Sequence, residues 1–407
     1  MKRVLVLGAG FAGLWSAVGA QRKLHELGAD RTVQVTMVNR EPFHNIRVRN
    51  YEADLSDVCV PLNRVLDPIG VETIVGEVTE IHTPNHAVTV RTGAGVEHLN
   101  YDRLVIALGS EVAKPPIPGL DAFGFDVDTF RAAKKLEDHL MALPSKTNAS
   151  RSTVIVVGAG ATGIEVATEL PARLAAIFPE GEPCKVIVVD RSPNVAPDMG
   201  EEARQVIDRA LTQLGIQKIS GATVKSIEED EVILSNGEVI PASTVIWCAG
   251  MRASPLARTL GVTCDTLGRI AVDEFMRALD LADVFAAGDI ANAKINAEHG
   301  SVMSCQHGRP MGRFAGHNAV ADLLNLPMLP LRIDVYSTCV DLGPAGAVYT
   351  RGINRKLLAS GATAKETKNT INRVRIYPPR TGRAADILAA AAPIVQAVPA
   401  VGALTPA

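Results

Sequence analysis

The chain has 407 residues, of which 47% are hydrophobic and 21% charged, and its formal net charge is −3. A chain of this length can bury large cores and is expected to form two or three domains. The near balance of charges is typical of a soluble globular protein, and it predicts no nucleic-acid partner because such proteins are usually basic.

The cysteines predict neither a metal site nor a dithiol redox pair. Their spacing contains no C-x-x-C and no C-x4-C pair, and the six are Cys59, Cys184, Cys248, Cys264, Cys305 and Cys339. We expect reduced, buried thiols and a cytoplasmic protein. The N-terminal "MKR" before an apolar run resembles a secretory signal, but a glycine turn follows it, so we expect the segment to stay in place.

Residues 1–40 predict a nucleotide-binding βα unit. The stretch "VLVLGAGFAGLWSAV" begins as an apolar strand, turns at a G-x-G-x-x-G motif and continues as a helix expected from Gly13 to Leu27. A second strand is expected at 33–39. The motif glycines are Gly8, Gly10 and Gly13, and glycines at this spacing let the backbone approach a pyrophosphate at the N-terminus of a helix.

The next segments predict an excursion, a group of strands and a linker. Residues 40–62 carry charges and prolines that suit a surface-and-cleft excursion. Residues 71–110 predict short alternating strands that end on an apolar one. The Pro-rich residues 113–120 are expected to be a linker, and a helix is expected at 129–143.

The stretch "VIVVGAGATGIEVATEL", residues 154–170, repeats the opening pattern. It contains Gly158, Gly160 and Gly163 in the same motif, and its helix is expected to end near Ile177. A strand at 185–190 and a helix at 201–214 should follow. One glycine motif is a weak signal, but two with the same surroundings indicate two bound nucleotides.

The rest of the chain returns to the first unit and then adds a third. The stretch "STVIWCAG" closes the second unit, and a helix is expected at 305–324. Short β-like runs and an Ala/Pro-rich tail follow from about residue 331. This order predicts one domain inserted within another, with boundaries at 1–117 with 245–328, at 118–244 and at 329–407.

Three further stretches make the chain resemble a known family. They are "YDRLVIALGS", "TVIWCAG" and "ADVFAAGDIA". With the two glycine motifs they resemble the flavoprotein reductases with two dinucleotide-binding domains, which are pyridine nucleotide-disulfide oxidoreductase-like. Within that group, "GAGATGIEVATEL" and "CVDLGPAGAVYTRGINRK" are most similar to type II NADH dehydrogenases. The resemblance implies an α/β fold with two Rossmann-like three-layer ββα domains, the NAD domain inserted in the FAD domain, and a small C-terminal α+β domain.

For the first unit the resemblance implies an FAD site. Asn39 stands where an acidic residue is expected to hold the ribose, and the loss of charge should weaken that contact by about 1 kcal/mol. Asp289 is expected at the ribityl chain, with a helix cap as its alternative role, and Gly288 should let the flavin come close. The other cofactor-binding candidates are Phe11, Ala12, Arg40, Val78, Ala107, Gly109 and Gly250.

For the second unit the resemblance implies a nicotinamide dinucleotide site. Asp190 is expected to bind the adenosine 2′-hydroxyl and to repel a 2′-phosphate, which favours NADH. Arg191 keeps NADPH open because an arginine can bind that phosphate. Glu165 is expected near both cofactors as a positioning residue, and its alternative role is compensation of the helix dipole.

The acceptor side departs from the resembling enzymes. Their A-Q-x-x-x-Q-Q motif aligns with "CQHGRPM", in which Gln306 is kept while Pro310 and Met311 replace two glutamines. We expect Gln306 near the flavin and fewer donors for a quinone than in the resembling enzymes. The tail contains Pro393 and Pro399 and lacks cationic anchors, so we expect a loosely packed or disordered tail and doubtful, at most peripheral, membrane association.

Four residues of the excursion stay without an assigned role. His44, Arg47, Arg49 and Tyr51 fit either a solvated charged loop or a segment that reaches the flavin. In the second case Arg47 or Arg49 would contact a cofactor phosphate or an anionic acceptor.

The predicted function is hydride transfer from NADH to flavin N5, followed by reduction of a small, quinone-like acceptor. Disulfide reduction is disfavoured because no paired cysteines follow the first glycine helix. Two alternatives stay open, namely a redox-sensing or scaffold flavoprotein with negligible turnover and a reductase of a small electron-carrier protein. A homodimer also stays open.

Overall fold

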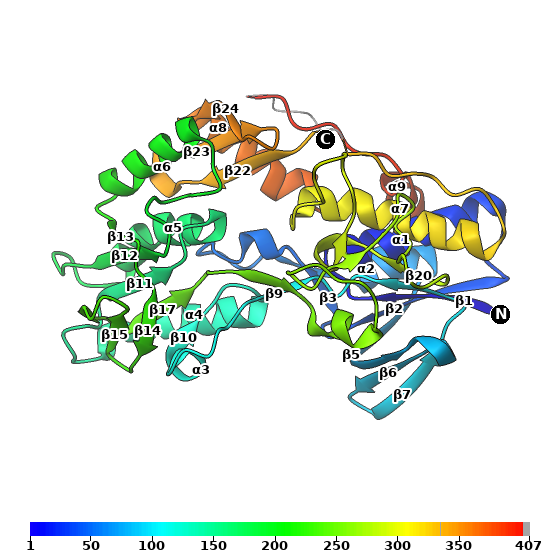
Figure 1. Ribbon diagram of the computed structural model, residues 1–407, viewed down its shortest axis with the longest axis horizontal. Helices are drawn as coiled ribbons and strands as arrows, with labels where there is room; N and C mark the ends of the chain where they lie inside the picture. Colours follow the sequence, from blue (N-terminus) through cyan, green and yellow to red (C-terminus); the bar gives the residue numbers. More distant parts are fainter. Residues whose placement is uncertain (334, 402–407) are drawn as a thin grey trace.

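The computed structural model describes residues 1–333 and 335–401. Its first sheet has seven strands in the order β20-β8-β1-β2-β5-β6-β7, and the five strands from β20 to β5 run parallel (Figure 1). The bounds are β1 Lys2–Leu7, β2 Val33–Asn39, β5 Glu72–His82, β6 Ala87–Thr92, β7 Gly95–Asn100, β8 Arg103–Ile106 and β20 Val284–Ala286.

The strands of a second sheet lie, in the sequence, between β8 and β20 of the first sheet. It has five parallel strands in the order β10-β17-β11-β12-β13. A three-stranded antiparallel sheet packs on one of its faces, and helices pack on the other. The bounds are β10 Gly124–Phe125, β11 Thr153–Val157, β12 Lys185–Asp190, β13 Gln217–Ser220, β14 Val224–Ile227, β15 Glu231–Leu234, β16 Val239–Pro241 and β17 Thr244–Trp247, with helices α4 Phe130–Ala142, α5 Ala161–Ile177 and α6 Glu201–Gln213.

These layers confirm the predicted α/β class with two Rossmann-like units. One expected boundary needs correction. Strand β17 pairs with β11 from Val154–Thr244 to Val157–Trp247, so a boundary at 244/245 would cut a strand of the second sheet. We propose that the second unit ends after residue 247, and we keep the other boundaries as proposals.

The C-terminal segment forms a small sheet with helices. Strands β22, β23 and β24 are antiparallel and pack against α5 and α6 of the second unit (Figure 1). The bounds are β22 Ser337–Asp341, β23 Ala347–Arg351, β24 Lys356–Ser360, α8 Gly361–Thr370 and α9 Ala384–Ala390. The remaining short elements are β3 Phe43–Asn45, β4 Cys59–Pro61, α2 Asn63–Leu66, β9 Ser110–Val112, α3 Leu120–Phe123, β18 Met251–Ala253, β19 Ile270–Ala271 and β21 Ala291–Asn292.

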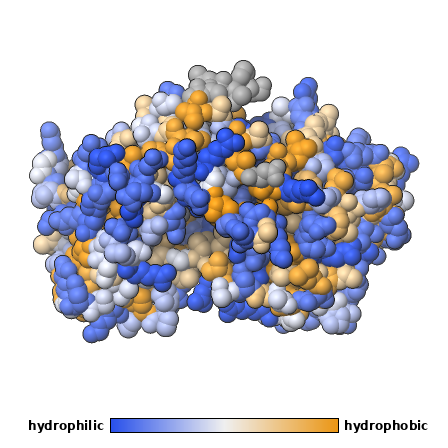
Figure 2. Space-filling view, turned by 45° about the horizontal axis from the view of Figure 1, so that its top comes forward, coloured by the Kyte–Doolittle hydropathy of each residue, from blue (hydrophilic) through white to orange (hydrophobic). Residues whose placement is uncertain are grey.

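The prediction of a loosely packed or disordered tail is wrong for α9, whereas residues 392–401 form no helix or strand and are largely exposed. Helix α9 packs against α1 Phe11–Leu27, and Ile387 is fully buried there. Beyond α9, the carbonyl oxygen of Pro399 accepts a hydrogen bond of 2.9 Å from the Tyr349 hydroxyl. Exposed apolar side chains remain at Ile394, Val395 and Val401. Figure 2 shows that hydrophobic side chains lie among hydrophilic ones over this face of the molecule. Residues 402–407 lie outside the described residues.

Helix α7, Cys305–Leu323, crosses α1 at backbone contact (Figure 1). Gly308, Gly312 and Gly316 recur every four residues and so form one stripe on the helix. A Cβ on Gly312 would lie 2.1 Å from the carbonyl oxygen of Ala12, and one on Gly316 would lie 1.9 Å from that of Ser16. Only glycine permits this approach, which places the start of α7 beside the first glycine turn.

We expect Gly312→Ala to destabilise the protein. The added methyl group meets backbone atoms that cannot rotate away, and overpacking of this kind costs about 1–3 kcal/mol. Equilibrium unfolding in guanidinium chloride measures the change. The control is Gly93→Ala, at an exposed position where a Cβ meets no atom within 4 Å. Equal stability of the two variants would contradict the close-contact argument.

Candidate active site

The predicted site residues gather around two adjoining cavities. A cavity of about 2480 Å³ is lined by residues from both glycine motifs, among them Gly10, Asn39, Gly160, Asp190 and Arg191. A second cavity of about 660 Å³ is lined by Phe11, Ala12, Glu165, Gly288, Asp289 and Gln306. The other predicted residues that line the first cavity are Gly8, Arg40, Val78, Ala107, Gly109, Gly158 and Gly250.

Two predicted residues, Gly13 and Gly163, line neither cavity. A Cβ on Gly13 would lie 1.7 Å from the Gly8 carbonyl oxygen, and one on Gly163 would lie 1.8 Å from that of Gly158. These glycines therefore let the helix pack against its own turn. Gly8 and Gly158 have φ values of +93° and +106°, a region that favours glycine.

The middle glycine of each motif faces open space. A Cβ on Gly10 or on Gly160 would meet no atom within 4 Å, and both residues line the large cavity. Helices α1 and α5 begin directly after them, and the first backbone N–H groups of a helix attract anions. Each turn thus has room and donors for a pyrophosphate, which is what two dinucleotides require.

We expect Gly10→Val and Gly160→Val to separate the two nucleotides. Each side chain should fill the space of one pyrophosphate without disturbing the fold, since no protein atom is near. Gly10→Val should yield protein without bound FAD. Gly160→Val should keep its FAD and raise the Kd for NADH at least about tenfold, the usual scale for a lost charge-assisted bond.

The two variants control each other. Flavin absorbance per chain and NADH titration of the purified proteins measure both effects. Loss of FAD from both variants, or from neither, would contradict the assignment of the turns.

Asn39 and Asp190, which end β2 and β12, each hold a glycine turn by a matching hydrogen bond. Asn39 Oδ1 accepts a hydrogen bond of 2.9 Å from the Ala9 N–H, and Asp190 Oδ2 accepts one of 2.6 Å from the Ala159 N–H. Asn39 also donates to the carbonyl oxygen of Glu41 at 2.7 Å. An amide therefore holds the first turn as a carboxylate holds the second, and ribose binding by either residue stays a prediction.

Asp289 lies in a polar cluster with a residue of the excursion. Its Oδ2 accepts a hydrogen bond of 2.6 Å from the Ser110 hydroxyl and lies 3.8 Å from Arg47 Nη1. Arg47 also pairs with Asp128, whose pKa is raised by burial although Arg47 opposes the shift. Gly288 has a φ of +79°, and a Cβ on it would lie 2.6 Å from that of Ala12.

His44, Arg49 and Tyr51 are buried, so the solvated-loop alternative is wrong for these three residues. Arg49 is 1% exposed, donates to Glu52 at 2.9 and 2.7 Å, and bonds to the Tyr377 hydroxyl. His44 is fully buried and its Nδ1 lies 2.7 Å from the Ala9 carbonyl oxygen. Burial lowers the pKa of His44 to about 4, so the ring is neutral at pH 7. His44 therefore supports the first glycine turn, while Arg49 joins the excursion to Tyr377 of the C-terminal segment.

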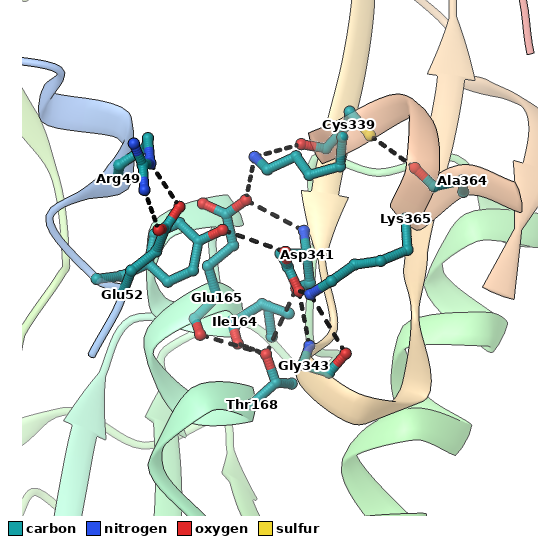
Figure 3. A network of polar contacts seen from close by, with 12 residues as sticks. Arg49, Glu52, Ile164, Glu165, Thr168, Cys339, Asp341, Gly343, Ala364 and Lys365 are labelled. Atoms are coloured by element: carbon teal, nitrogen blue, oxygen red, sulfur yellow. Dashed lines mark hydrogen bonds and ion pairs between the residues drawn. The ribbon is translucent and has the colours of Figure 1, made fainter. Parts of the chain in front are cut away.

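Glu165 is the centre of a buried polar network (Figure 3). Its Oε1 accepts hydrogen bonds from Lys368 Nζ at 2.6 Å and from the Asp341 N–H at 3.1 Å. Lys368 also donates to the Cys339 carbonyl oxygen at 3.0 Å. Tyr51 completes the group, because its hydroxyl donates to Asp341 Oδ2 at 3.3 Å.

Burial and pairing shift the pKa values of Glu165 and Lys368 in opposite directions. Burial raises the pKa of Glu165, and the Lys368 ammonium partly reverses that rise. Burial lowers the pKa of Lys368, but Glu165 and its neighbours outweigh it and hold the pKa above its usual value. Lys368 is therefore charged at neutral pH. The sequence missed Lys368, which lies 203 residues from its partner and in no motif.

We expect Lys368→Met to cost about 3–5 kcal/mol of unfolding free energy, because it leaves a buried carboxylate without its cation. Denaturant unfolding measures the loss. The control Lys365→Met should cost about 1 kcal/mol or less, since that side chain is 32% exposed and Asp341 keeps other donors. A combined Glu165→Gln, Lys368→Met variant should recover much of the loss, and failure to recover would contradict the pairing.

Gln306 lies in the first turn of α7 and lines the smaller cavity. Its Nε2 donates to the Val335 carbonyl oxygen at 3.3 Å, and its Oε1 accepts from the Ser337 N–H at 3.1 Å. The amide therefore anchors the chain that enters β22, which the sequence did not predict.

Sequence reasoning missed the donors that lie beside Gln306. Met311 packs in the core and does not line the cavity, whereas Arg309 and Arg313 line it together with Pro310. The error has a geometric cause. Successive helix positions lie about 100° apart, so the partners of a given face are three and four residues away rather than next in sequence.

Comparisons with known proteins agree with this arrangement. The sequence pattern of the pyridine nucleotide-disulphide oxidoreductases matches residues 2–312. The NADH dehydrogenase-like protein MT1860 of Mycobacterium tuberculosis is 52% identical over 403 residues, which are 98% of this chain and 100% of that protein. The chain therefore belongs to the pyridine nucleotide-disulphide oxidoreductase family.

Two more distant proteins are also similar. A type II NADH:quinone oxidoreductase of Staphylococcus saprophyticus is 28% identical over 88% of this chain and 92% of its own length. The solved structure of NDH2 from Plasmodium falciparum in complex with NADH superposes with a TM-score of 0.76, over 95% of this chain and 97% of that one, at 13% identity.

These findings confirm the predicted resemblance and class. The protein is a pyridine nucleotide-dependent oxidoreductase, with FAD and NAD(H) as its cofactors. Among the described residues, no helix is both long enough and apolar enough to span a membrane.

Proposed function

We propose that the protein is an NADH:acceptor oxidoreductase that reduces a quinone-like molecule. The overall reaction is NADH + H⁺ + quinone → NAD⁺ + quinol. The observation that carries the proposal is the pair of open turns at Gly10 and Gly160 on one cavity. Bound FAD supplies the chemistry, since it accepts a hydride from a nicotinamide and passes two electrons to an acceptor.

We assign the two turns by their surroundings. The first turn adjoins Gly288 and Asp289, so we propose that it holds FAD. The second turn is then the NADH site, with Asp190 at its edge. Glu165, held by Lys368 beside the smaller cavity, is proposed to position the reacting rings and to exclude water from them.

We expect Asp190→Asn to narrow the preference for NADH over NADPH. The change removes the charge that would repel a 2′-phosphate, and Asn39 shows that an amide oxygen can still hold a glycine turn. The ratio of kcat/KM for NADH to that for NADPH should fall by about tenfold or more.

The control variant is Asn39→Asp, at the turn assigned to FAD, and it should leave this ratio unchanged. Steady-state kinetics with both nucleotides measures the effect. A wild-type protein that uses NADPH equally well would contradict the role of Asp190.

The smaller cavity is proposed to take the acceptor. Its wall includes apolar and aromatic side chains such as Ile333, Tyr336 and Ile371, which suit a flat ring. The quinone named for the staphylococcal relative supports the same choice. A cytoplasmic location stays a prediction, which cell fractionation tests.

Anaerobic stopped-flow kinetics tests the proposal. NADH should bleach the flavin, and short-chain quinones should restore its colour through many turnovers. Rapid reoxidation only by a small electron-carrier protein would favour the carrier reductase. Bleaching that no acceptor in the panel reverses would favour a redox sensor.

A further inference from the structure

Two buried guanidinium groups line the acceptor cavity without a carboxylate partner. Arg309 is 8% exposed and Arg313 is 1% exposed. Within the described part of the chain, the side chain of Arg309 makes no hydrogen bond or ion pair. Arg313 donates one bond of 3.4 Å, to the Ile394 carbonyl oxygen, and its Nε and Nη2 atoms are unpartnered.

Their charges are only partly compensated inside the protein. Both guanidinium groups lie over the ring of Trp15, at 5.4 and 4.5 Å from its centre. A ring face attracts a cation less strongly than a carboxylate does, and burying an unpaired charge is costly. The arrangement therefore leaves positive charge to be met by a ligand.

Both groups stay charged at neutral pH. Burial lowers the pKa of Arg309 to about 10, and burial together with the charge of Arg309 lowers the pKa of Arg313 to about 9. Three carboxylates of the cavity wall pair with cations other than Arg309 and Arg313: Asp126 with Lys114, Asp128 with Arg47 and Glu165 with Lys368.

The other polar groups that act on Arg309 are Arg375 and Cys305, and they add positive charge or none. Arg375 lies close enough to contribute to the lowered pKa of Arg309, and its Nη2 donates to the Ala397 carbonyl oxygen at 2.6 Å. Burial raises the pKa of the Cys305 thiol, which keeps it neutral. The potential beside Arg309 and Arg313 is therefore positive.

We propose that the acceptor carries an acidic group and that Arg309 and Arg313 bind it. The inference rests on the proposed function, since it concerns the acceptor side of the same reaction. One turn of helix separates the two guanidinium groups, so a carboxylate between them can accept from both. The apolar wall holds the ring, and the acceptor class is a planar quinone with a carboxylate or similar anionic substituent.

The test compares two ligands of the same shape that cannot be reduced by the flavin. Naphthalene-2-carboxylate and naphthalene-2-carboxamide differ in charge but hardly in size. Their Kd values for the oxidised holoenzyme are measured by titration calorimetry, without NADH. The wild type should bind the carboxylate at least about tenfold more tightly than the amide, as expected for charge-assisted bonds.

Two variants and a control locate the effect. Arg309→Gln combined with Arg313→Met should bring the two Kd values within about twofold, and Arg309→Lys alone should keep part of the difference because it keeps a charge. The control Arg383→Gln removes an exposed guanidinium that pairs with Asp386 outside the cavity, and it should behave as the wild type does.

Two results would overturn the proposal. One is equal affinity of the wild type for the two ligands. The other is a double variant that still prefers the carboxylate. If that variant has also lost FAD, the guanidinium groups pair with the cofactor instead. Anaerobic bleaching of the flavin by NADH is recorded for each protein. Its absence would defeat the proposed function and would leave the ligand comparison intact.

Discussion

The close crossing of α1 and α7 is the contact on which the candidate site depends. Gly312 and Gly316 let the two backbones touch, so residues about 300 positions apart in the chain meet at one place. The contact brings Gly288 and the start of α7 against the first glycine turn. It also turns Arg309 and Arg313 toward Trp15 and the smaller cavity.

A second long-range contact joins the other two units. Glu165 belongs to the helix after the second glycine turn, and Lys368 belongs to the C-terminal segment. A buried ion pair is weak support for stability by itself, but it is costly to break. The pair therefore sets where the C-terminal sheet lies against α5, and with it one wall of the smaller cavity.

The two glycine motifs keep the same backbone hydrogen bond, although the residue that accepts it differs. Asn39 and Asp190 stand at matching places and accept the same kind of backbone bond. The difference in charge thus leaves the turn intact and bears only on the ligand. Among the three glycines of each motif, only the middle one has room for a Cβ, while the first and third glycines pack against neighbouring backbone.

The sequence by itself determined the two strand–turn–helix units, the inserted order, the family and a group of site residues, most of which line the cavities. These features can be predicted from short stretches of sequence, because the spacing of glycines and the periodicity of apolar residues extend over only a few positions. Only the tertiary structure decided the pairing of Glu165 with Lys368, the placement of Arg309 and Arg313, and the packing of the tail. Each of these depends on which surfaces meet when the units pack, and no local pattern records that choice.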